Sequence, residues 1–393
     1  MKLLFISPKY YPTQGGGSER SLKLLVDGLL KKGHDVSVLS FDGKKRIIEE
    51  SINGAKVIRV KKLSLKPSTL SHNLTLLLFR NIIKKEDPDV IHVYNTWHIP
   101  ASIFLKGIAP VVATLNNVFP ICATAYTRDR IIEKGKTSFL SMFHGLFITF
   151  DKSFFKKFFL AAGYSLYSVF IRTLSKRLDY YIAYSKSIKE IYVKNNFEES
   201  KIFVINTLFD KKEIEPRNKT GKIVLYVGSA TEVKGFFELV RAISILKRKD
   251  IEFRLVGITE LDQQIEKKIL KIDNVKLVRK LPYNELEEHY NQASCLIYPA
   301  QIPDMFPRVW IEAITHNLPI ISSDQPVALD VLKNAALFYK RGSPKDLAEK
   351  IDKFFKNEEV IDIAVAKKDL FSKTPMEDMI KLYNKMIEDG RKN

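Results

Sequence analysis

The sequence predicts an α/β protein of two Rossmann-like domains, each with a doubly wound parallel sheet, that face each other across a cleft. Three observations lead to this prediction. The chain has 393 residues, which is too long for one ordinary core and suits two domains of about 200 residues each. Short apolar runs alternate with helical stretches in two series, and a polar stretch, "DKKEIEPRNKTG" (210–221), separates the series.

The first series predicts an N-terminal domain at residues 1–212. It begins with a strand-like run at Leu3–Ser7, a Gly-rich loop, and helical spacing of apolar residues from Ser18 to Leu30. Further strand candidates have the same short apolar character: 34–41, 55–60, 89–95, 110–117, 180–185 and 201–209. Because helical stretches separate these strands, the sheet is expected to be parallel.

The second series predicts a C-terminal domain at residues 217–372. Its strand candidates, each followed by a helical segment, are 222–228, 251–257, 275–281, 294–299 and 318–323. The last segment, 373–393, contains a helix with no strand partner, which is expected to pack back on the N-terminal domain. Ligands of such sheets bind beyond the carboxyl ends of the strands, so the cleft between the domains is the expected site.

Charge and composition narrow the range of partners. The formal charge of +19 calls for a polyanion: nucleic acid, anionic lipid or a phosphorylated small molecule. No helix-turn-helix, zinc-finger or aromatic RNA-binding signature is present, so nucleic acid is not expected. The two cysteines, Cys122 and Cys295, are too few for a disulfide framework or a zinc site. The N-terminal apolar run of about five residues is too short for a signal peptide, and a cytoplasmic location is expected.

The stretch "VLYVGSATEVKGFFELV" (224–240) predicts a strand, a turn and a helix start. A lysine in this turn, Lys234, lies beside the helix N-terminus, where a phosphate would be well placed. We therefore predict a phosphate contact, with an ordinary loop lysine as the alternative. Gly15–Gly17, after the first strand, also allow close approach of a ligand to the backbone. They do not form G-x-G-x-x-G, so dinucleotide binding is not expected; a flexible surface loop is the alternative.

The stretch "YPAQIPDMFPRVWIEAITHNLPII" (298–321) carries two candidate carboxylates. Pro307 lies where a first helical turn would start. Asp304 precedes this helix, and Glu312 lies in its second turn. A carboxylate can accept hydrogen bonds from sugar hydroxyls, and the amides at the helix start can hold a diphosphate. The alternative is a capping acid together with a solvated helix acid.

The order of these motifs resembles the retaining GT-B glycosyltransferases called group 1, or glycosyltransferase family four. The chain shows "PTQGGGSERSLKLLVDGLLKKGHDVSVLS", then "YVGSATEVKG", then "YPAQIPDMFPRVWIEAITHNLPIISS", over nearly its whole length. The resemblance implies an enzyme that transfers a hexose-type sugar, with retention, from a UDP- or GDP-linked donor to a glycan or lipid-linked acceptor. Cell-surface polysaccharide, glycolipid or protein-glycan biosynthesis would be its setting.

The resemblance also implies roles for single residues. Lys234 would hold the donor diphosphate, Glu312 would bind the donor ribose, and Asp304 would face the transferred sugar. The implied catalytic residues are Asp304, Asn116 and Lys234. The implied donor-binding residues are Gly16, Gly17, Ser229, Lys234, Phe306, Pro307, Arg308 and Glu312. Of these, Phe306 and Pro307 stand where the family's backbone amides approach the sugar and diphosphate.

Three departures from the family pattern leave an alternative open. Ser229 replaces the family's phosphate arginine, for which Arg308 or Arg128 could substitute. Asp304 replaces a glutamate, and Asn116 replaces a histidine near the transferred sugar. These changes favour a degenerate, non-catalytic GT-B protein that binds a nucleotide-sugar or a partner glycosyltransferase. A nucleotide-sugar epimerase is a further alternative, but it would need more carboxylates and histidines in the cleft than this sequence provides.

No metal or other cofactor is expected. A nucleoside diphosphate is a good leaving group once its charge is neutralised, and a lysine with helix-start amides can neutralise it. The one DxD-like string, "EDPDV" (86–90), is predicted to be a turn rather than a metal site. His92, in "VIHVYN", is predicted to be a core histidine with satisfied hydrogen bonds rather than a catalytic one.

Residues 137–175 form an aromatic insert with phenylalanines every three or four positions, which predicts helix. Lys152, Lys156 and Lys157 lie between two uncharged runs of about fourteen residues, whereas a bilayer span needs about 20. We therefore hypothesise that the insert contacts an anionic membrane surface and that the protein is peripheral on the inner face of the cell membrane. The alternative is a helical excursion packed on the first domain.

Overall fold

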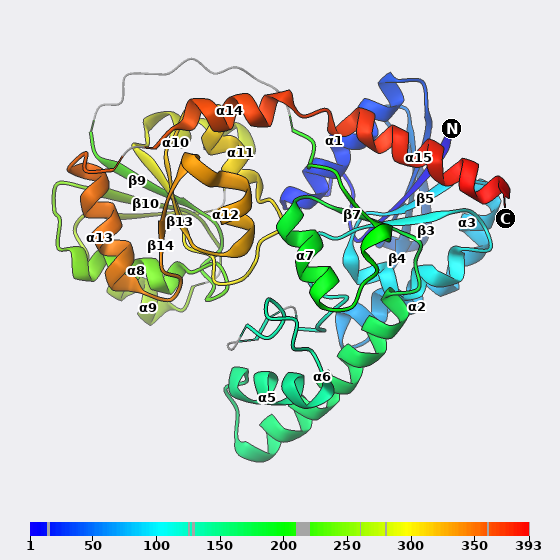
Figure 1. Ribbon diagram of the computed structural model, residues 1–393, viewed down its shortest axis with the longest axis horizontal. Helices are drawn as coiled ribbons and strands as arrows, with labels where there is room; N and C mark the ends of the chain where they lie inside the picture. Colours follow the sequence, from blue (N-terminus) through cyan, green and yellow to red (C-terminus); the bar gives the residue numbers. More distant parts are fainter. Residues whose placement is uncertain are drawn as a thin grey trace. The chain divides into compact units, whose positions relative to one another are not determined.

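A computed structural model of the protein describes residues 1–13, 16–124, 126–127, 130–209, 221–259, 261–279, 281–359 and 361–392. The chain divides into two compact units, and each has its own sheet (Figure 1). Unit 1 comprises Met1–Asp210 and Thr374–Asn393, and unit 2 comprises Lys211–Lys373. Both units are α/β, and all described strands pair in parallel except β3 at one edge of the unit 1 sheet, so the structure confirms the predicted fold class.

The sheet of unit 1 has the strand order β3-β4-β2-β1-β5-β6-β7-β8. Its strands are β1 (Lys2–Ser7), β2 (Asp35–Ser40), β3 (Asp42–Ile52), β4 (Ala55–Lys61), β5 (Val90–Val93), β6 (Val111–Thr114), β7 (Tyr180–Ala183) and β8 (Ile202–Val204). Its α-helices are α1 (Gly17–Lys31), α2 (Ser68–Leu78), α3 (Arg80–Glu86), α4 (Ile99–Ser102), α5 (Phe139–Thr149), α6 (Phe154–Ser175), α7 (Lys186–Lys194) and α15 (Pro375–Lys392). Short 3₁₀ turns are η1 (Thr96–His98), η2 (Ile103–Leu105) and η3 (Glu199–Lys201).

Strand β3 corrects the expectation of an entirely parallel sheet, because it runs antiparallel to β4 at the sheet edge. The two strands are joined by Asn53-Gly54, whose φ angles of 53° and 93° are those of a type I′ hairpin turn. The side chains of β3 are exposed or half-buried throughout. An edge strand without a buried face shows no apolar run, and for this reason the hydrophobic pattern did not predict it.

The C-terminal helix α15 belongs to the core of unit 1. Met379, Leu382, Tyr383 and Met386 pack in the same buried cluster as the apolar face of α1 and residues of β1 and β5. The Tyr383 hydroxyl lies 2.7 Å from His92 Nδ1, and His92 Nε2 lies 2.7 Å from Thr114 Oγ1. Burial lowers the pKa of His92 to about 3, so its ring is neutral at physiological pH. His92 is therefore a core histidine with both nitrogens satisfied, as the sequence predicted.

Unit 2 has a six-stranded parallel sheet with the order β11-β10-β9-β12-β13-β14. Its strands are β9 (Ile223–Val227), β10 (Glu252–Ile258), β11 (Val275–Arg279), β12 (Cys295–Tyr298), β13 (Ile320–Ser323) and β14 (Ala336–Tyr339). Its helices are α8 (Phe236–Leu246), α9 (Gln263–Ile269), α10 (Tyr283–Gln292), α11 (Arg308–Thr315), α12 (Pro326–Leu332), η4 (Lys333–Ala335), α13 (Pro344–Phe355) and α14 (Ile363–Ser372).

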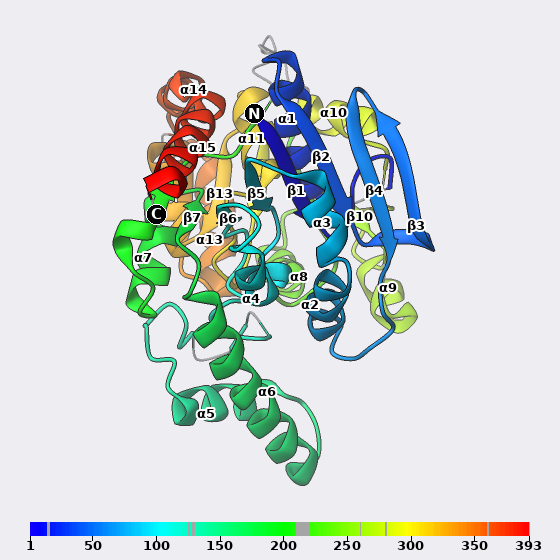
Figure 2. The same ribbon diagram turned by 90° about the vertical axis from the view of Figure 1, so that its right-hand side faces the viewer.

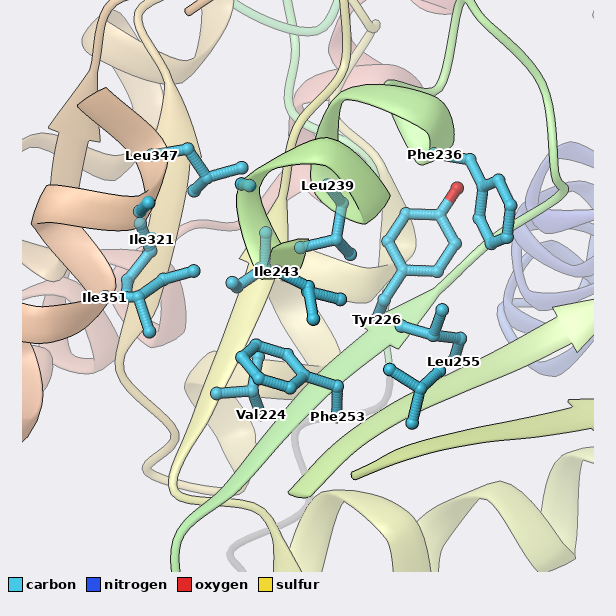
Figure 3. Packing of buried hydrophobic residues seen from close by; sticks show 14 of the residues in the cluster. Val224, Tyr226, Phe236, Leu239, Ile243, Phe253, Leu255, Ile321, Leu347 and Ile351 are labelled. Carbon is cyan, nitrogen blue, oxygen red and sulfur yellow. The ribbon is translucent and has the colours of Figure 1, made fainter. Parts of the chain in front are cut away.

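This strand order is the 3-2-1-4-5-6 order of the doubly wound fold, counted within the unit. Figure 3 shows its core, in which Val224 and Tyr226 of β9 and Phe253 of β10 lie under Leu239 and Ile243 of α8. The order reverses between β9 and β12, so the connections that follow these two strands leave toward opposite faces. In such sheets the crevice at this switch point, beyond the carboxyl ends of the strands, is where ligands bind.

We predict that the hydroxyl of Tyr383 anchors α15. In a Tyr383→Phe variant, His92 would lose one of its two buried hydrogen bonds, which costs about 1–3 kcal/mol. The thermal unfolding midpoint, followed by circular dichroism, should therefore fall. Tyr11→Phe is the control, because the Tyr11 side chain is exposed, and it should leave the midpoint unchanged. A Tyr383→Phe variant that melts with this control would contradict the anchoring role.

Candidate functional site

The two loops that follow β9 and β12 meet at the switch point of unit 2. The amide of Gln301, in the loop after β12, donates to the Val233 carbonyl in the loop after β9, at 2.9 Å. Gly235 makes this meeting possible. Its φ is +71°, and a Cβ atom built on it would lie 1.8 Å from the Pro299 carbonyl oxygen. Only glycine allows both this backbone conformation and this close approach.

The side chains that these loops carry form an ion pair. The Lys234 ammonium donates to Asp304 Oδ2, and the Tyr298 hydroxyl donates to the same oxygen. Lys234 and Asp304 are both partly exposed, whereas Tyr298 is buried. The structure thus brings together the predicted phosphate lysine and the predicted sugar-facing acid, which are separated by 70 positions in the sequence.

The electrostatics of this cluster keep the carboxylate charged. Burial raises the pKa of Asp304, but the Lys234 ammonium and the hydrogen bonds from Lys234, Tyr298 and the Met305 backbone outweigh it, and the net pKa lies below its ordinary value. Burial, together with the charge of Asp304, raises the pKa of Tyr298 and of Tyr226. Both tyrosines are therefore neutral hydrogen-bond donors, and Asp304 is an anion.

Sequence reasoning missed the two tyrosines. Tyr298 ends β12, and Tyr226 lies in β9, where its hydroxyl donates to the Ser229 carbonyl at 2.8 Å. Each appears in the sequence as one more apolar residue of a strand run. Their position in the sequence could have identified them, because a tyrosine at the carboxyl end of a strand beside the switch point can direct its hydroxyl toward the loops.

The turn before α11 differs in detail from the predicted amide site. Phe306 has a left-handed φ of 58° and donates its amide to the Asp304 carbonyl at 3.0 Å. Pro307 is the N-cap residue and has no N–H to offer. The first amides of α11 are those of Arg308 and Val309.

Glu312 and Arg308 form a separate pair on α11. Glu312 Oε2 accepts a hydrogen bond from the Tyr290 hydroxyl at 2.8 Å, and its Oε1 lies 3.8 Å from Arg308 Nε. Both side chains of the pair are largely buried, and the ring of Tyr290 stacks on His316. Through these contacts Glu312 joins α10 to its own helix, α11, and neither contact goes to the Lys234–Asp304 pair.

Ser229 lies in the loop after β9, half-buried, with its hydroxyl 3.4 Å from Thr231 Oγ1. Of the two arginines considered as substitutes for the family's arginine, Arg308 pairs with Glu312, and Arg128 lies outside the described residues. Both Lys234 and Arg341 contact the switch-point loops: Lys234 donates to Asp304, and the Arg341 guanidinium donates to the Gln301 carbonyl at 3.2 Å.

The predicted residues of unit 1 lie at the carboxyl edge of its sheet. Gly16 is the N-cap residue of α1 and donates its amide to Glu19 Oε2 at 2.8 Å, and Gly17 begins the helix; Gly15 lies outside the described residues. Asn116 follows β6 and donates to the Tyr94 carbonyl at 3.0 Å and to Ser18 Oγ at 3.2 Å. The amide of Asn116 thus ties the end of β5 to the start of α1.

Among the described residues, no cluster of three or more histidine, cysteine, aspartate and glutamate side chains could hold a metal ion. The two cysteines are buried and unpaired with each other. The "EDPDV" segment connects the end of α3 to the start of β5. Within it Asp87 is left-handed, and the Asp89 carboxylate accepts the Lys2 amide at 2.7 Å.

Two family models match the chain. The model described as Glycosyltransferase Family 4 matches residues 15–213, and the model described as Glycosyl transferases group 1 matches residues 209–368.

Relatives with curated names include an uncharacterized 42.6 kDa protein in the cps region of Klebsiella pneumoniae, 25% identical, with 80% of this chain and 83% of the relative covered. Another is the O-antigen chain mannosyltransferase RfbU of Salmonella typhimurium, 26% identical, with 42% of this chain and 47% of the relative covered.

Two solved structures are similar to this chain in fold. Sucrose-phosphate synthase from Thermosynechococcus elongatus has a TM-score of 0.75 at 16% identity, with 99% of each chain covered. Anabaena HepE, solved in complex with UDP-glucose, has a TM-score of 0.66 at 14% identity, with 100% of each chain covered.

We predict that Gly235→Ala disrupts the switch point. The added methyl group would collide with the Pro299 carbonyl and hold an unfavourable φ, which together cost about 2–4 kcal/mol. Urea unfolding should show the loss. Gly107→Ala is the matched control, because a Cβ atom at Gly107 meets no atom within 4 Å. Equal stability of the two variants would show that the loops do not require this close approach.

Proposed function

The chain belongs to the group 1 glycosyltransferases of glycosyltransferase family 4, and from this premise we propose that it transfers a hexose-type sugar, with retention, from a UDP- or GDP-linked donor. The acceptor is a glycan or a lipid-linked glycan, and the enzyme acts in the cytoplasm, peripheral on the inner face of the membrane. The observation that carries the proposal is the Lys234–Asp304 ion pair at the switch point of unit 2.

The proposed donor site follows from charge and topology. The switch point is where a doubly wound sheet binds its ligand, and a diphosphate needs positive charge there. Lys234 provides an ammonium group that is only partly exposed and is held by one carboxylate. Binding of UDP-glucose by a protein of similar fold supports a nucleotide-sugar donor for this chain.

The proposed chemistry needs charge neutralisation more than acid–base groups. The bond between the sugar and the diphosphate breaks as the acceptor hydroxyl forms a new bond to the same sugar carbon, and the hydroxyl proton passes to the leaving diphosphate. Lys234 with the amides at the start of α11 would stabilise the negative charge that develops on the diphosphate. No metal enters this proposal. As Lys234 turns to the diphosphate, Asp304 is released to accept hydrogen bonds from sugar hydroxyls.

The remaining predicted site residues would bind or position the substrates rather than stabilise the leaving group. Glu312 would bind the donor ribose by exchanging its bond from Tyr290 for bonds from ribose hydroxyls. Asn116 is proposed as a positioning residue, since an amide can act as neither acid nor base and its hydrogen bonds fix the loops of unit 1. The roles of Gly16, Gly17 and Ser229 stay predictions.

The proposed acceptor class is supported by the relatives. One of them is named as an O-antigen chain mannosyltransferase and another lies in a cps region. Both names support a role for this chain in the synthesis of a cell-surface polysaccharide.

A second candidate function is nucleotide-sugar binding without transfer. It is favoured by Ser229, which places a hydroxyl where the family has an arginine. Loss of a charged hydrogen bond to phosphate weakens binding by about 1.5–3 kcal/mol.

We predict opposite effects of substitutions at the two ends of the ion pair. Lys234→Ala removes the cation and should weaken UDP or GDP binding, measured by calorimetry, about tenfold or more. Asp304→Asn removes the carboxylate that competes for Lys234, so nucleotide affinity should rise while sugar transfer falls. Lys249→Ala, at an exposed lysine of unit 2, should change neither. Unchanged affinity in Lys234→Ala would exclude its role in diphosphate binding.

Transfer itself is tested with the purified chain, a panel of UDP-, GDP- and ADP-sugars, and a membrane lipid extract. The proposal predicts release of one nucleoside diphosphate together with labelled glycan that stays in the lipid fraction. Donor binding without transfer in any extract would instead support the second candidate function.

A further inference from the structure

Helices α5 and α6 form an aromatic hairpin, residues 139–175, whose α5 and N-terminal half of α6 project from the rest of unit 1 (Figures 1 and 2). Rings of the two helices hold the hairpin together. The ring centroids of Phe143 and Phe158 are 5.3 Å apart, and those of Phe147 and Phe154 are 5.7 Å apart. The hairpin thus has an internal aromatic contact of its own.

The polarity of α6 is the reverse of that of a helix on a soluble protein. Its buried residues are mostly small or polar: Ala161, Ser165, Ser168, Ile171 and Ser175. Its exposed residues include Phe155 (75% exposed), Phe159 (71%), Leu166 (63%) and Phe170 (58%). The spacing of these four positions places them on one face of the helix. Helices that face lipid show this arrangement, with small residues toward the protein and large apolar residues outward.

Basic residues accompany this apolar face near the free end of the hairpin. Lys152 and Lys156 are exposed, and Lys157 Nζ lies 6.0 Å from the centroid of the Phe147 ring. Asp151 is the acidic neighbour, which leaves an excess of positive charge on a chain whose formal charge is already +19. Lysines at the edge of an apolar face can direct their ammonium groups to lipid phosphates.

The same charges argue against self-association. A symmetric pair of chains joined through this face would bring the same patch of each copy together, and with it the three lysines of each. Like charges juxtaposed in an interface are unfavourable. An anionic lipid bilayer has negatively charged headgroups over an apolar interior. It therefore complements both the lysines and the exposed apolar side chains of the hairpin.

Among the described residues, no helix is long and apolar enough to cross a membrane. The exposed side of α6 is therefore suited to lie in the interface plane, with its apolar side chains at the boundary between headgroups and acyl chains.

We propose that the aromatic hairpin docks this enzyme on an anionic phospholipid bilayer. Phe155, Phe159, Leu166 and Phe170 enter the interface, and Lys152, Lys156 and Lys157 contact lipid phosphates. The proposal rests on the proposed function in one respect: docking brings the enzyme to the surface that holds a lipid-linked acceptor. Binding itself needs neither donor nor transfer.

Vesicle flotation of the full chain tests the proposal. Vesicles of phosphatidylcholine are compared with vesicles of phosphatidylcholine mixed with phosphatidylglycerol, at low and high salt. The wild type should float with the anionic vesicles, and less at high salt. Phe155→Ser/Phe159→Ser should reduce vesicle binding about tenfold or more on both compositions. Lys152→Ala/Lys156→Ala should mainly remove the preference for anionic lipid and the salt dependence.

Two control variants separate docking from general surface effects. Leu329→Ser removes an exposed apolar side chain from α12 of unit 2 (48% exposed), and Lys249→Ala removes an exposed lysine. Both should float like the wild type. Nucleotide binding by the phenylalanine variant should equal that of the wild type, which shows that the variant is folded and keeps the two proposals distinguishable.

Wild-type protein that stays at the bottom with anionic vesicles would overturn the proposal, as would a phenylalanine variant that floats normally. Analytical ultracentrifugation tests the competing occupant, a second copy of the chain. A concentration-dependent dimer that Phe155→Ser/Phe159→Ser abolishes, without a change in flotation, would assign the face to self-association instead.

Discussion

The candidate site depends on the close approach of two backbone segments, at Gly235 and at the Pro299 carbonyl. The strand order of unit 2 brings the loops after β9 and β12 to the same point, and the absent side chain of Gly235 lets them touch. The hydrogen bond from Gln301 to Val233 then fixes their register. Lys234 and Asp304 meet because the residues next to them in the chain are held in this contact. Fold topology and one glycine are thus the physical origin of a charged pair that sequence distance alone would not suggest.

In the proposed mechanism the ion pair has two states. Without a ligand, Asp304 neutralises Lys234, and burial together with the tyrosine hydroxyl of Tyr298 orients the carboxylate. With a diphosphate bound as proposed, the lysine would have a more highly charged partner, and the carboxylate would become an acceptor for hydroxyl groups. This change of partners would need no large movement of the backbone, because Lys234 and Asp304 already lie in the two loops that meet at the switch point. This exchange would also let a chain with serine at position 229 present positive charge to a diphosphate at the switch point.

Sequence reasoning reached the fold class because apolar strand runs and helical stretches alternate with regular spacing. It placed Lys234 and Asp304 in the right loops, since both follow strand ends that the pattern marks clearly. It missed β3, whose exposed side chains carry no apolar run, and it missed the hydroxyl partners Tyr298 and Tyr290, because a strand or helix tyrosine gives no sign of where its hydroxyl points. It marked the phenylalanine stripe of 137–175 but not its direction. That the large side chains of α6 point outward and the serines inward is a property of packing, which one sequence does not display.

The most direct test of this account is a crystal structure of the chain with bound UDP. We expect a diphosphate oxygen within hydrogen-bond distance of Lys234 Nζ, near the first amides of α11. We also expect that Asp304 has given up its contact with the lysine or shares it with the diphosphate. A diphosphate bound elsewhere, with the Lys234–Asp304 pair intact, would contradict it.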